Sequence, residues 1–183
     1  PFKLLDILYK KEFILFVVLV SILIINSNIS PYFLDLYNLI DSTFLFSEKA
    51  IIALTMTFVI IARQIDLSVA SIIAVSSCVL GYTTSLGYDT WLVISLTLLS
   101  GAICGAFNGA IITKFAIPSI IVTIGTMSLF RGLAYSFLED SYYNKFPKLV
   151  SNLGGGYLFG YIPYAFLTFI IFAIIFAFIL HKT

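Results

Sequence analysis

The chain has 183 residues, of which 61% are hydrophobic and 10% are charged, and its mean hydropathy is +1.10. So little polar surface cannot cover a water-soluble globule of this size, and the composition therefore predicts a membrane protein. Ten Lys and Arg residues nearly balance nine Asp and Glu residues. This balance leaves no basic surface of the kind that binds nucleic acid.

Runs of apolar residues divide the chain into candidate helices, because about 20 such residues are needed to cross a hydrocarbon core of about 30 Å. They predict an all-α fold, a polytopic transmembrane helix bundle forming a single domain over residues 1–183. Six spans are expected, at about 13–30, 47–65, 67–86, 91–113, 117–135 and 162–180. The first is a retained span instead of a signal peptide, because "NSNISPYF" after it offers no small-x-small cleavage site.

The segments between the spans have their own signals. Residues 31–46 mix acidic, amide and aromatic side chains and suit the outer interface, and Ser47 with Glu48 is typical of a helix start. Pro118 lies where we expect the first turn of the fifth span, a position that tolerates proline. Residues 136–160 are predicted to form a polar, glycine-rich loop.

The distribution of basic residues predicts the orientation. With the N-terminus in the cytosol, six basic residues fall on the inner side: Lys3, Lys10, Lys11, Arg63, Lys114 and Lys182. Three fall on the outer side, Lys49, Lys145 and Lys148, diluted there by Asp35, Asp41, Glu48, Asp89, Glu139 and Asp140. His181, beside Lys182, fits a cytosolic flank better than a catalytic role.

Cys78 and Cys104 both lie inside apolar runs, without a His or a second Cys at metal-ligand spacing. We expect free, buried thiols, and neither a disulfide nor a metal site.

The stretch "RQIDLSVAS", residues 63–71, places polar and ionisable side chains in the middle of an apolar chain. The apolar run before it, 50–62, makes only about 20 Å of helix, too short to span unless the helix starts near Ser47. The motif therefore marks a break between two helices, at or just inside the inner surface. It is either a capped turn that obeys the charge rule or a break that lines a cavity, where transporters hold their solute.

The same stretch contains signals for the next helix. We expect Asp66 to be the N-cap of a helix that begins at Leu67, with Ser68 as the second candidate. Arg63, one helical turn away, is the expected counter-charge of Asp66.

The fourth span contains "GAICGAFNG", in which three glycines recur every four residues. Such a stripe allows another helix backbone to approach closely, and Asn108 beside it could form a hydrogen bond across the contact. Helix packing is the simplest interpretation.

In the fifth span, "IPSIIVTIGTMSLFRGLAY", hydroxyl side chains recur along the helix. Those of Thr123 and Thr126 could bond to their own backbone. Arg131 either reaches the outer headgroups or faces a polar interior.

Two strings, "MTFVIIARQIDLSVASIIAVSS" and "GAICGAFNGAIITKFAIPSIIVTIGTMSLFRGLAY", resemble the membrane permease of bacterial ABC importers of the ribose, rhamnose and autoinducer-2 type, in the branched-chain-permease-like superfamily. The resemblance extends from about Asn38 to the end of the chain. Three motifs occur in the family's order, with its spacing, on successive predicted spans.

The family's Ile-Asp-Leu-Ser-Val motif falls on residues 65–69, with Ser71 as its closing serine. Its Asn-Gly pair falls on residues 108–109, and its Thr-(Leu/Ile)-Gly-Thr motif on 123–126, followed by Arg-Gly at 131–132. The substrate-pathway or structural signature thus comprises Arg63, Asp66, Ser68, Ser71, Asn108, Thr123, Thr126 and Arg131. The expected helix-packing glycines are Gly101, Gly105, Gly109 and Gly125.

The chain departs from the common family pattern at two places. Arg63 and Gln64 stand where most members have Gly-Gly, and Ala70 replaces the usual glycine. The same substitutions resemble the rhamnose-import branch.

The resemblance implies a non-catalytic, multi-pass subunit of the bacterial inner membrane that translocates a monosaccharide or a related small polar solute. ATP and Mg²⁺ would bind to a separate cytosolic ATPase, and this chain would hold no cofactor. A periplasmic binding protein would deliver the sugar, and a second permease subunit, identical or related, would complete the pathway.

Two other functions compete with this hypothesis. An ion-coupled secondary transporter or channel would need an intramembrane carboxylate, for which Asp66 is the candidate. An intramembrane enzyme is disfavoured, because the sequence contains no G-x-S-x-G, no H-E-x-x-H and no paired intramembrane aspartates.

We also expect the chain to be an N-terminal fragment, because it starts without Met and stops after an apolar run. The ATPase-coupling site of a longer permease would then follow Thr183. The residues leave open which sugar is carried, and whether Asp66 contacts it or only caps a helix.

Overall fold

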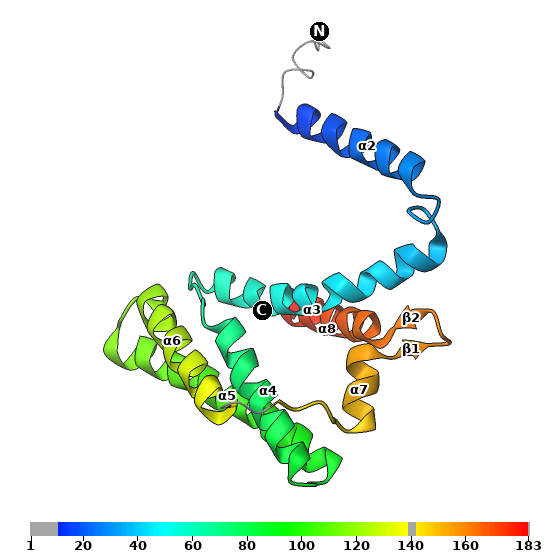
Figure 1. Ribbon diagram of the computed structural model, residues 1–183. Coiled ribbons are helices and arrows are strands. Elements are labelled where there is room, and N and C mark those ends of the chain that lie inside the picture. The colour runs from blue at the N-terminus through cyan, green and yellow to red at the C-terminus, as the bar shows by residue number, and fades with distance from the viewer. Residues whose placement is uncertain (1–10, 139–141, 183) are drawn as a thin grey trace.

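The computed structural model describes residues 11–138 and 142–182, and most of them are helical (Figure 1). The helices are α2 (Lys11–Ile29), α3 (Leu36–Ile61), α4 (Val69–Ser85), α5 (Thr90–Phe115), α6 (Ser119–Leu138), α7 (Lys148–Gly155) and α8 (Tyr164–Lys182). Five of the described helices are long and apolar enough to cross a membrane, namely α2, α3, α5, α6 and α8. The predicted all-α membrane bundle is thereby confirmed.

Helix α4 has 17 residues and is the shortest of the apolar helices. At about 1.5 Å per residue it measures about 26 Å, slightly less than the hydrocarbon core. The count of six spans therefore stays a prediction, as does the cytosolic N-terminus. Four residues used in predicting the orientation, Lys3, Lys10, Glu139 and Asp140, lie outside the described residues.

Helix α3 begins earlier than predicted. Asp35 is its N-cap, and the side chain accepts a hydrogen bond of 3.3 Å from the Asn38 N–H. The polar residues of 36–46 do not interrupt the helix, since the Ser42 and Thr43 hydroxyls bond to carbonyls of the preceding turn. The expected helix start at Ser47 is wrong, because that residue lies fully buried in the middle of α3.

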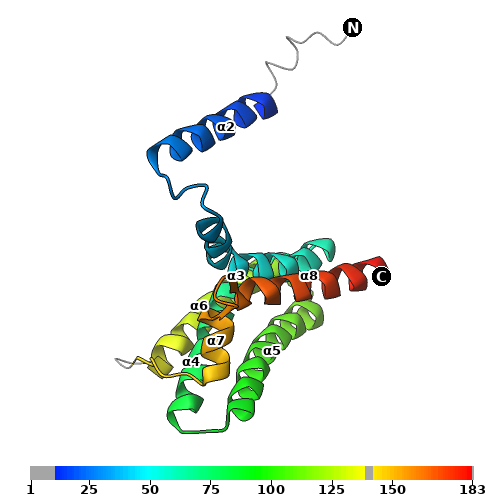
Figure 2. The same cartoon turned by 90° about the vertical axis from the view of Figure 1, so that its right-hand side faces the viewer.

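Helices α3 and α8 form a pair and run in the same direction (Figures 1 and 2). Phe46 of α3 meets Phe166 of α8 edge to face, with ring centroids 6.3 Å apart. Twelve residues further along α3, Phe58 meets Phe176 at 4.9 Å in the same geometry. Edge-to-face contacts of this kind add to the packing of apolar helices, and both helices therefore end at the same side of the molecule.

A second unit consists of α4, α5 and α6, with α4 packed against both of the others. Its core contains Val75 and Cys78 of α4, Cys104 of α5, and Phe130 and Ala134 of α6. Both cysteines are free and buried, as predicted. Both views show the α3–α8 pair to one side of this three-helix unit, with α2 standing apart (Figure 2).

The connection between α5 and α6 is short because of two backbone constraints. Ala116 adopts the left-handed conformation, with φ of 53°, and so ends α5. We predicted Pro118 in the first turn of α6, but it lies just before the helix. Its carbonyl accepts hydrogen bonds from the Ile121 and Val122 N–H groups. The proline therefore acts at the helix start, where its missing N–H is of no consequence.

The segment predicted as a loop at 136–160 contains regular structure. Helix α6 extends to Leu138, helix α7 occupies part of the segment, and a hairpin of β1 (Tyr157–Leu158) and β2 (Ile162–Pro163) follows. Phe159 and Gly160 both have positive φ, as the tight turn of such a hairpin requires. The Tyr157 hydroxyl donates a 2.6 Å hydrogen bond to Asp41 and so attaches the hairpin to the beginning of α3.

Candidate functional site at the helix break

The break between α3 and α4 begins with a C-terminal cap on α3. The Gln64 N–H donates to the Val59 carbonyl and the Arg63 N–H to the Ile60 carbonyl, which is the bonding pattern of a Schellman motif. This motif places Arg63 in the left-handed region, with φ of 55°. Glycine adopts that conformation at least cost, which explains why a glycine suits this position in the family that the sequence resembles.

The start of α4 is organised by Asp66, two residues before the helix N-cap. Its Oδ1 accepts hydrogen bonds from the Ser68 N–H at 2.8 Å and the Ser68 hydroxyl at 2.6 Å. The helix begins at Val69 with Ser68, the second predicted candidate, as the N-cap, so the predicted start at Leu67 with Asp66 as the N-cap is wrong. The carboxylate still lies at the positive end of the helix dipole, where a negative charge is stabilised.

Helix α5 contributes Asn108 to the same place. Its Nδ2 donates a 2.8 Å hydrogen bond to the Ser68 hydroxyl oxygen, across 40 residues of sequence. Asn108 is 4% exposed and Ser68 is fully buried. Because the Ser68 hydroxyl donates to Asp66 and accepts from Asn108, the three side chains form one relay that joins α5 to the break.

Helix α6 holds the other side of the break through the backbone of Ile65. The Ile65 N–H donates to the Ser119 hydroxyl at 3.0 Å, and the Ile65 carbonyl accepts from the Thr123 hydroxyl at 3.3 Å. Ser119 and Thr123 are one helical turn apart, and Figure 1 shows the start of α6 beside the break. Irregular backbone at membrane depth needs such partners, since lipid offers none.

The sequence motifs single out Thr123 but not Ser119 as a site residue. The available signal was spacing, because Ser119 precedes Thr123 by four residues and so lies on the same face of the helix. The role of the Ile65 backbone has no signal in the sequence, since every residue except proline supplies an N–H and a carbonyl.

Two buried polar atoms in this cluster have no hydrogen-bond partner among the described residues. They are Ser71 Oγ on α4 and Asn108 Oδ1 on α5. Ser71 is fully buried one turn after Ser68, whereas the buried Thr126 hydroxyl bonds to the Thr123 carbonyl. A buried polar atom without a partner costs about 1–3 kcal/mol of stability. Each of these two atoms can still form a hydrogen bond with a hydroxyl group of a bound molecule.

The two arginines of the predicted signature lie outside the cluster. Arg63 is exposed and forms no ion pair with Asp66, whose Oδ1 bonds to Ser68 instead. Arg131 lies 12 residues after Ser119 on α6, about 18 Å along the helix. It is exposed, and it borders a cavity of about 420 Å³ beside Cys78 and Ala134. The expected pairing of Arg63 with Asp66 is therefore not formed.

The four glycines predicted to pack helices differ in their surroundings. A Cβ at Gly101 would lie 3.3 Å from Ser76 Oγ on α4, so this glycine faces a packed neighbour. A Cβ at Gly105, Gly109 or Gly125 would meet nothing within 4 Å among the described residues. Helix α5 turns its Cys104 and Asn108 face toward the interior instead, and a packing role for the other three glycines stays a prediction.

Comparison with known proteins places this arrangement in a family. The family model described as "Branched-chain amino acid transport system / permease component" matches residues 38–183. The autoinducer 2 import system permease protein LsrD of Klebsiella pneumoniae is 38% identical over 121 residues, covering 66% of this chain and 36% of that protein. The ribose import permease protein RbsC of Haemophilus influenzae is 32% identical over 149 residues, covering 79% and 46% respectively.

The LsrC permease protein of Photorhabdus laumondii is 31% identical over 168 residues, covering 90% of this chain and 50% of that protein. The chain thus spans half or less of the length of these three relatives. No solved structure gives a significant match. The family model covers the helix break and both helices that hold it, and the chain belongs to the branched-chain amino acid transport system permease component family.

Proposed function

We propose that this chain is part of the permease subunit of an ABC importer that moves a monosaccharide, or a similarly small polar solute, across the bacterial inner membrane. The family and the ribose and autoinducer 2 permeases among the relatives support this proposal. A cytosolic ATPase supplies the energy, a periplasmic binding protein delivers the solute, and a second permease subunit completes the pathway. The permease itself carries out no chemistry.

The polar cluster at the helix break is the observation that supports a solute path most directly. Asp66, Ser68 and Asn108 form a relay between α4 and α5, and Ser71 Oγ and Asn108 Oδ1 are buried beside it without partners among the described residues. A membrane protein gains nothing in stability from such unpaired atoms. A solute with several hydroxyl groups would supply the missing hydrogen bonds during its passage.

This proposal gives the break a mechanical role as well. Ser68, Ser71 and Asn108 are buried in this structure, so passage of a solute between them requires α4 to move relative to α5 and α6. Irregular backbone between α3 and α4 permits that movement, while the bonds from Ser119 and Thr123 to Ile65 hold the closed arrangement. Discontinuous helices serve transporters in this way at their solute sites.

Reconstitution distinguishes this function from an ion-coupled transporter. The full-length permease is placed in liposomes with its ATPase, binding protein and any second permease subunit, and uptake of labelled D-ribose, D-xylose and L-rhamnose is measured. We expect uptake of one of these sugars to require ATP and to continue after an ionophore collapses ion gradients. Uptake by the permease alone, driven by an ion gradient and abolished in Asp66→Asn, would contradict the proposal.

A further inference from the structure

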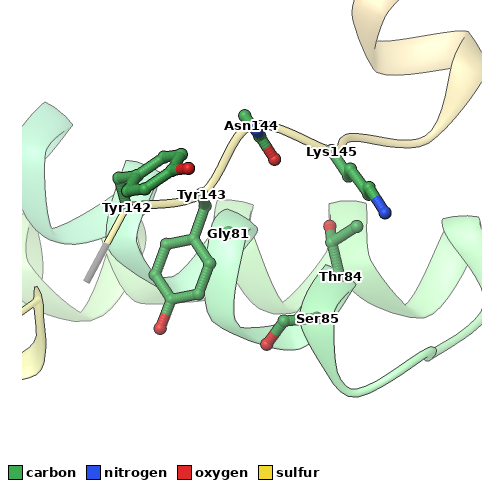
Figure 3. Close-up of a pocket in the computed structure, with 7 residues that line it drawn as sticks. All are labelled: Gly81, Thr84, Ser85, Tyr142, Tyr143, Asn144 and Lys145. Atoms are coloured by element: carbon green, nitrogen blue, oxygen red, sulfur yellow. The ribbon is translucent and has the colours of Figure 1, made fainter.

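A second polar site lies at the opposite end of α4 from the helix break. Residues 142–145 cross above the last turns of α4, and together with Gly81, Thr84 and Ser85 they line an open pocket of about 520 Å³ (Figure 3). This volume falls within the range of small-molecule pockets. In the predicted orientation this end of α4 faces the outside, where a solute arrives.

Tyr143 forms one wall of the pocket and is seated on the helix. A Cβ added at Gly81 would come within 2.6 Å of Tyr143 Cγ, a distance that real Cβ atoms do not show. Only glycine at position 81 therefore allows the ring to lie against α4. Figure 3 shows Tyr143 and Lys145 both extending from the crossing segment toward the helix. The position of the Tyr143 wall is therefore set by its packing against Gly81 as well as by the conformation of residues 142–145.

The lining offers hydrogen-bonding groups that have no partner among the described residues. The side chains of Tyr142, Tyr143, Asn144 and Lys145 form no hydrogen bond or ion pair with the rest of the described chain. Together they present two phenol hydroxyls, an amide and an ammonium group. The Thr84 hydroxyl donates its proton to the Leu80 carbonyl, which leaves its oxygen free to accept.

The chemistry of this lining matches a neutral polyhydroxyl solute. Aromatic rings present a flat apolar face to the C–H groups of a sugar, and amide, phenol and ammonium groups bond to its hydroxyls. The pocket lies at the C-terminal end of α4, where the helix dipole is negative and disfavours an anion. Lys145 is the one cation of its lining and offsets that dipole, so neither a phosphate nor a carboxylate is favoured.

We propose that this pocket is an outer binding site for the sugar, which the solute occupies before it reaches the helix break; the inference rests on the proposed transport function. Tyr142 and Tyr143 contact the ring of the sugar, and Asn144 and Lys145 bond to its hydroxyl groups. The site is weak, because Tyr142 is 80% exposed and its ring covers only one side of a solute.

The test measures sugar binding directly on the full-length permease in nanodiscs, without the ATPase or the binding protein. The probe is whichever of D-ribose, D-xylose and L-rhamnose the complete transporter takes up, detected by saturation-transfer difference NMR. We expect Tyr142→Ala and Lys145→Gln each to weaken binding by about three- to tenfold. The matched controls Tyr88→Ala and Lys148→Gln alter exposed residues outside the pocket and should leave binding unchanged.

Uptake by the complete transporter separates the remaining outcomes. The inference requires the two pocket variants to raise the KM for uptake while the maximal rate stays near that of the unaltered protein. Equal binding by the pocket variants and the unaltered permease would overturn it. So would lost uptake with unchanged sugar binding, which would make this surface a contact for a partner protein. Failure of the unaltered transporter to take up any sugar would instead refute the proposed function.

Discussion

Replacing Ser68 by alanine removes the central hydroxyl of the relay at the helix break. The substitution deletes the 2.6 Å bond to Asp66 and the 2.8 Å bond from Asn108, and leaves the buried Asn108 amide with neither its Nδ2 nor its Oδ1 paired. Side-chain hydrogen bonds between membrane helices are worth about 0.6 kcal/mol on average and up to about 1.7, and bonds to charged groups about 1.5–3 kcal/mol. We expect Ser68→Ala to lower the free energy of unfolding by about 2 kcal/mol.

A double-mutant cycle makes this expectation specific. In the Ser68→Ala background, Asn108→Leu removes both unpaired amide groups and should restore part of the stability, giving a coupling of about 1 kcal/mol. Unfolding of the full-length protein in mixed micelles, followed by circular dichroism during SDS titration, measures each variant. Ser77→Ala, exposed on the same helix, is the control. If the losses of unfolding free energy caused by Ser68→Ala and Asn108→Leu are additive in the double variant, the relay is refuted.

Three further substitutions test other parts of the fold. Arg63→Gly should raise the free energy of unfolding by about 0.5–1 kcal/mol, because glycine adopts a φ of 55° without strain, whereas Arg63→Ala should not. Ser119→Ala should lower it by about 1–2 kcal/mol, because the Ile65 N–H loses its acceptor. Tyr157→Phe should lower the Tm, because the hairpin loses its bond to Asp41. That hydrogen bond raises the pKa of Tyr157, so its stabilisation is complete below the ordinary tyrosine pKa of about 10 and lost as the pH rises through the higher folded value. The difference in Tm between the unaltered protein and Tyr157→Phe should therefore be constant from about pH 6 to 9 and should decrease toward zero above that range.

Apolar runs predicted most of the helices, because a span needs length and little else. They placed α2, α5, α6 and α8 to within a few residues of their observed bounds. The start of α3 was missed, because Asn38 and Asp41 resemble a polar connection between helices. A helix tolerates such residues where its end lies at the membrane–water interface. Helix α7 and the hairpin were missed for a similar reason, because the glycines of 154–156 suggested a loop throughout.

The short apolar run before Arg63 was enough to predict the helix break. Ser68, the second of the two predicted candidates, is the observed N-cap of α4. That its hydroxyl would bond to Asn108 could not be predicted, because Asn108 lies 40 residues further along the chain. Periodicity along one helix does not say which face of another helix it will meet. For the same reason, the sequence indicated a buried Cys104 and a hydrogen bond from Asn108 across a helix contact, but not that Asn108 would meet Ser68 of α4.

The measurement that tests the central claim most directly is sugar uptake by a Ser71→Ala variant of the complete importer. Ser71 Oγ is buried without a partner among the described residues, so removing it should leave stability unchanged or slightly higher. If the cluster at the helix break lines the solute path, uptake should show a KM raised about three- to tenfold, while Ser77→Ala behaves like the unaltered protein. Uptake by Ser71→Ala that equals the unaltered rate at every sugar concentration would contradict the account.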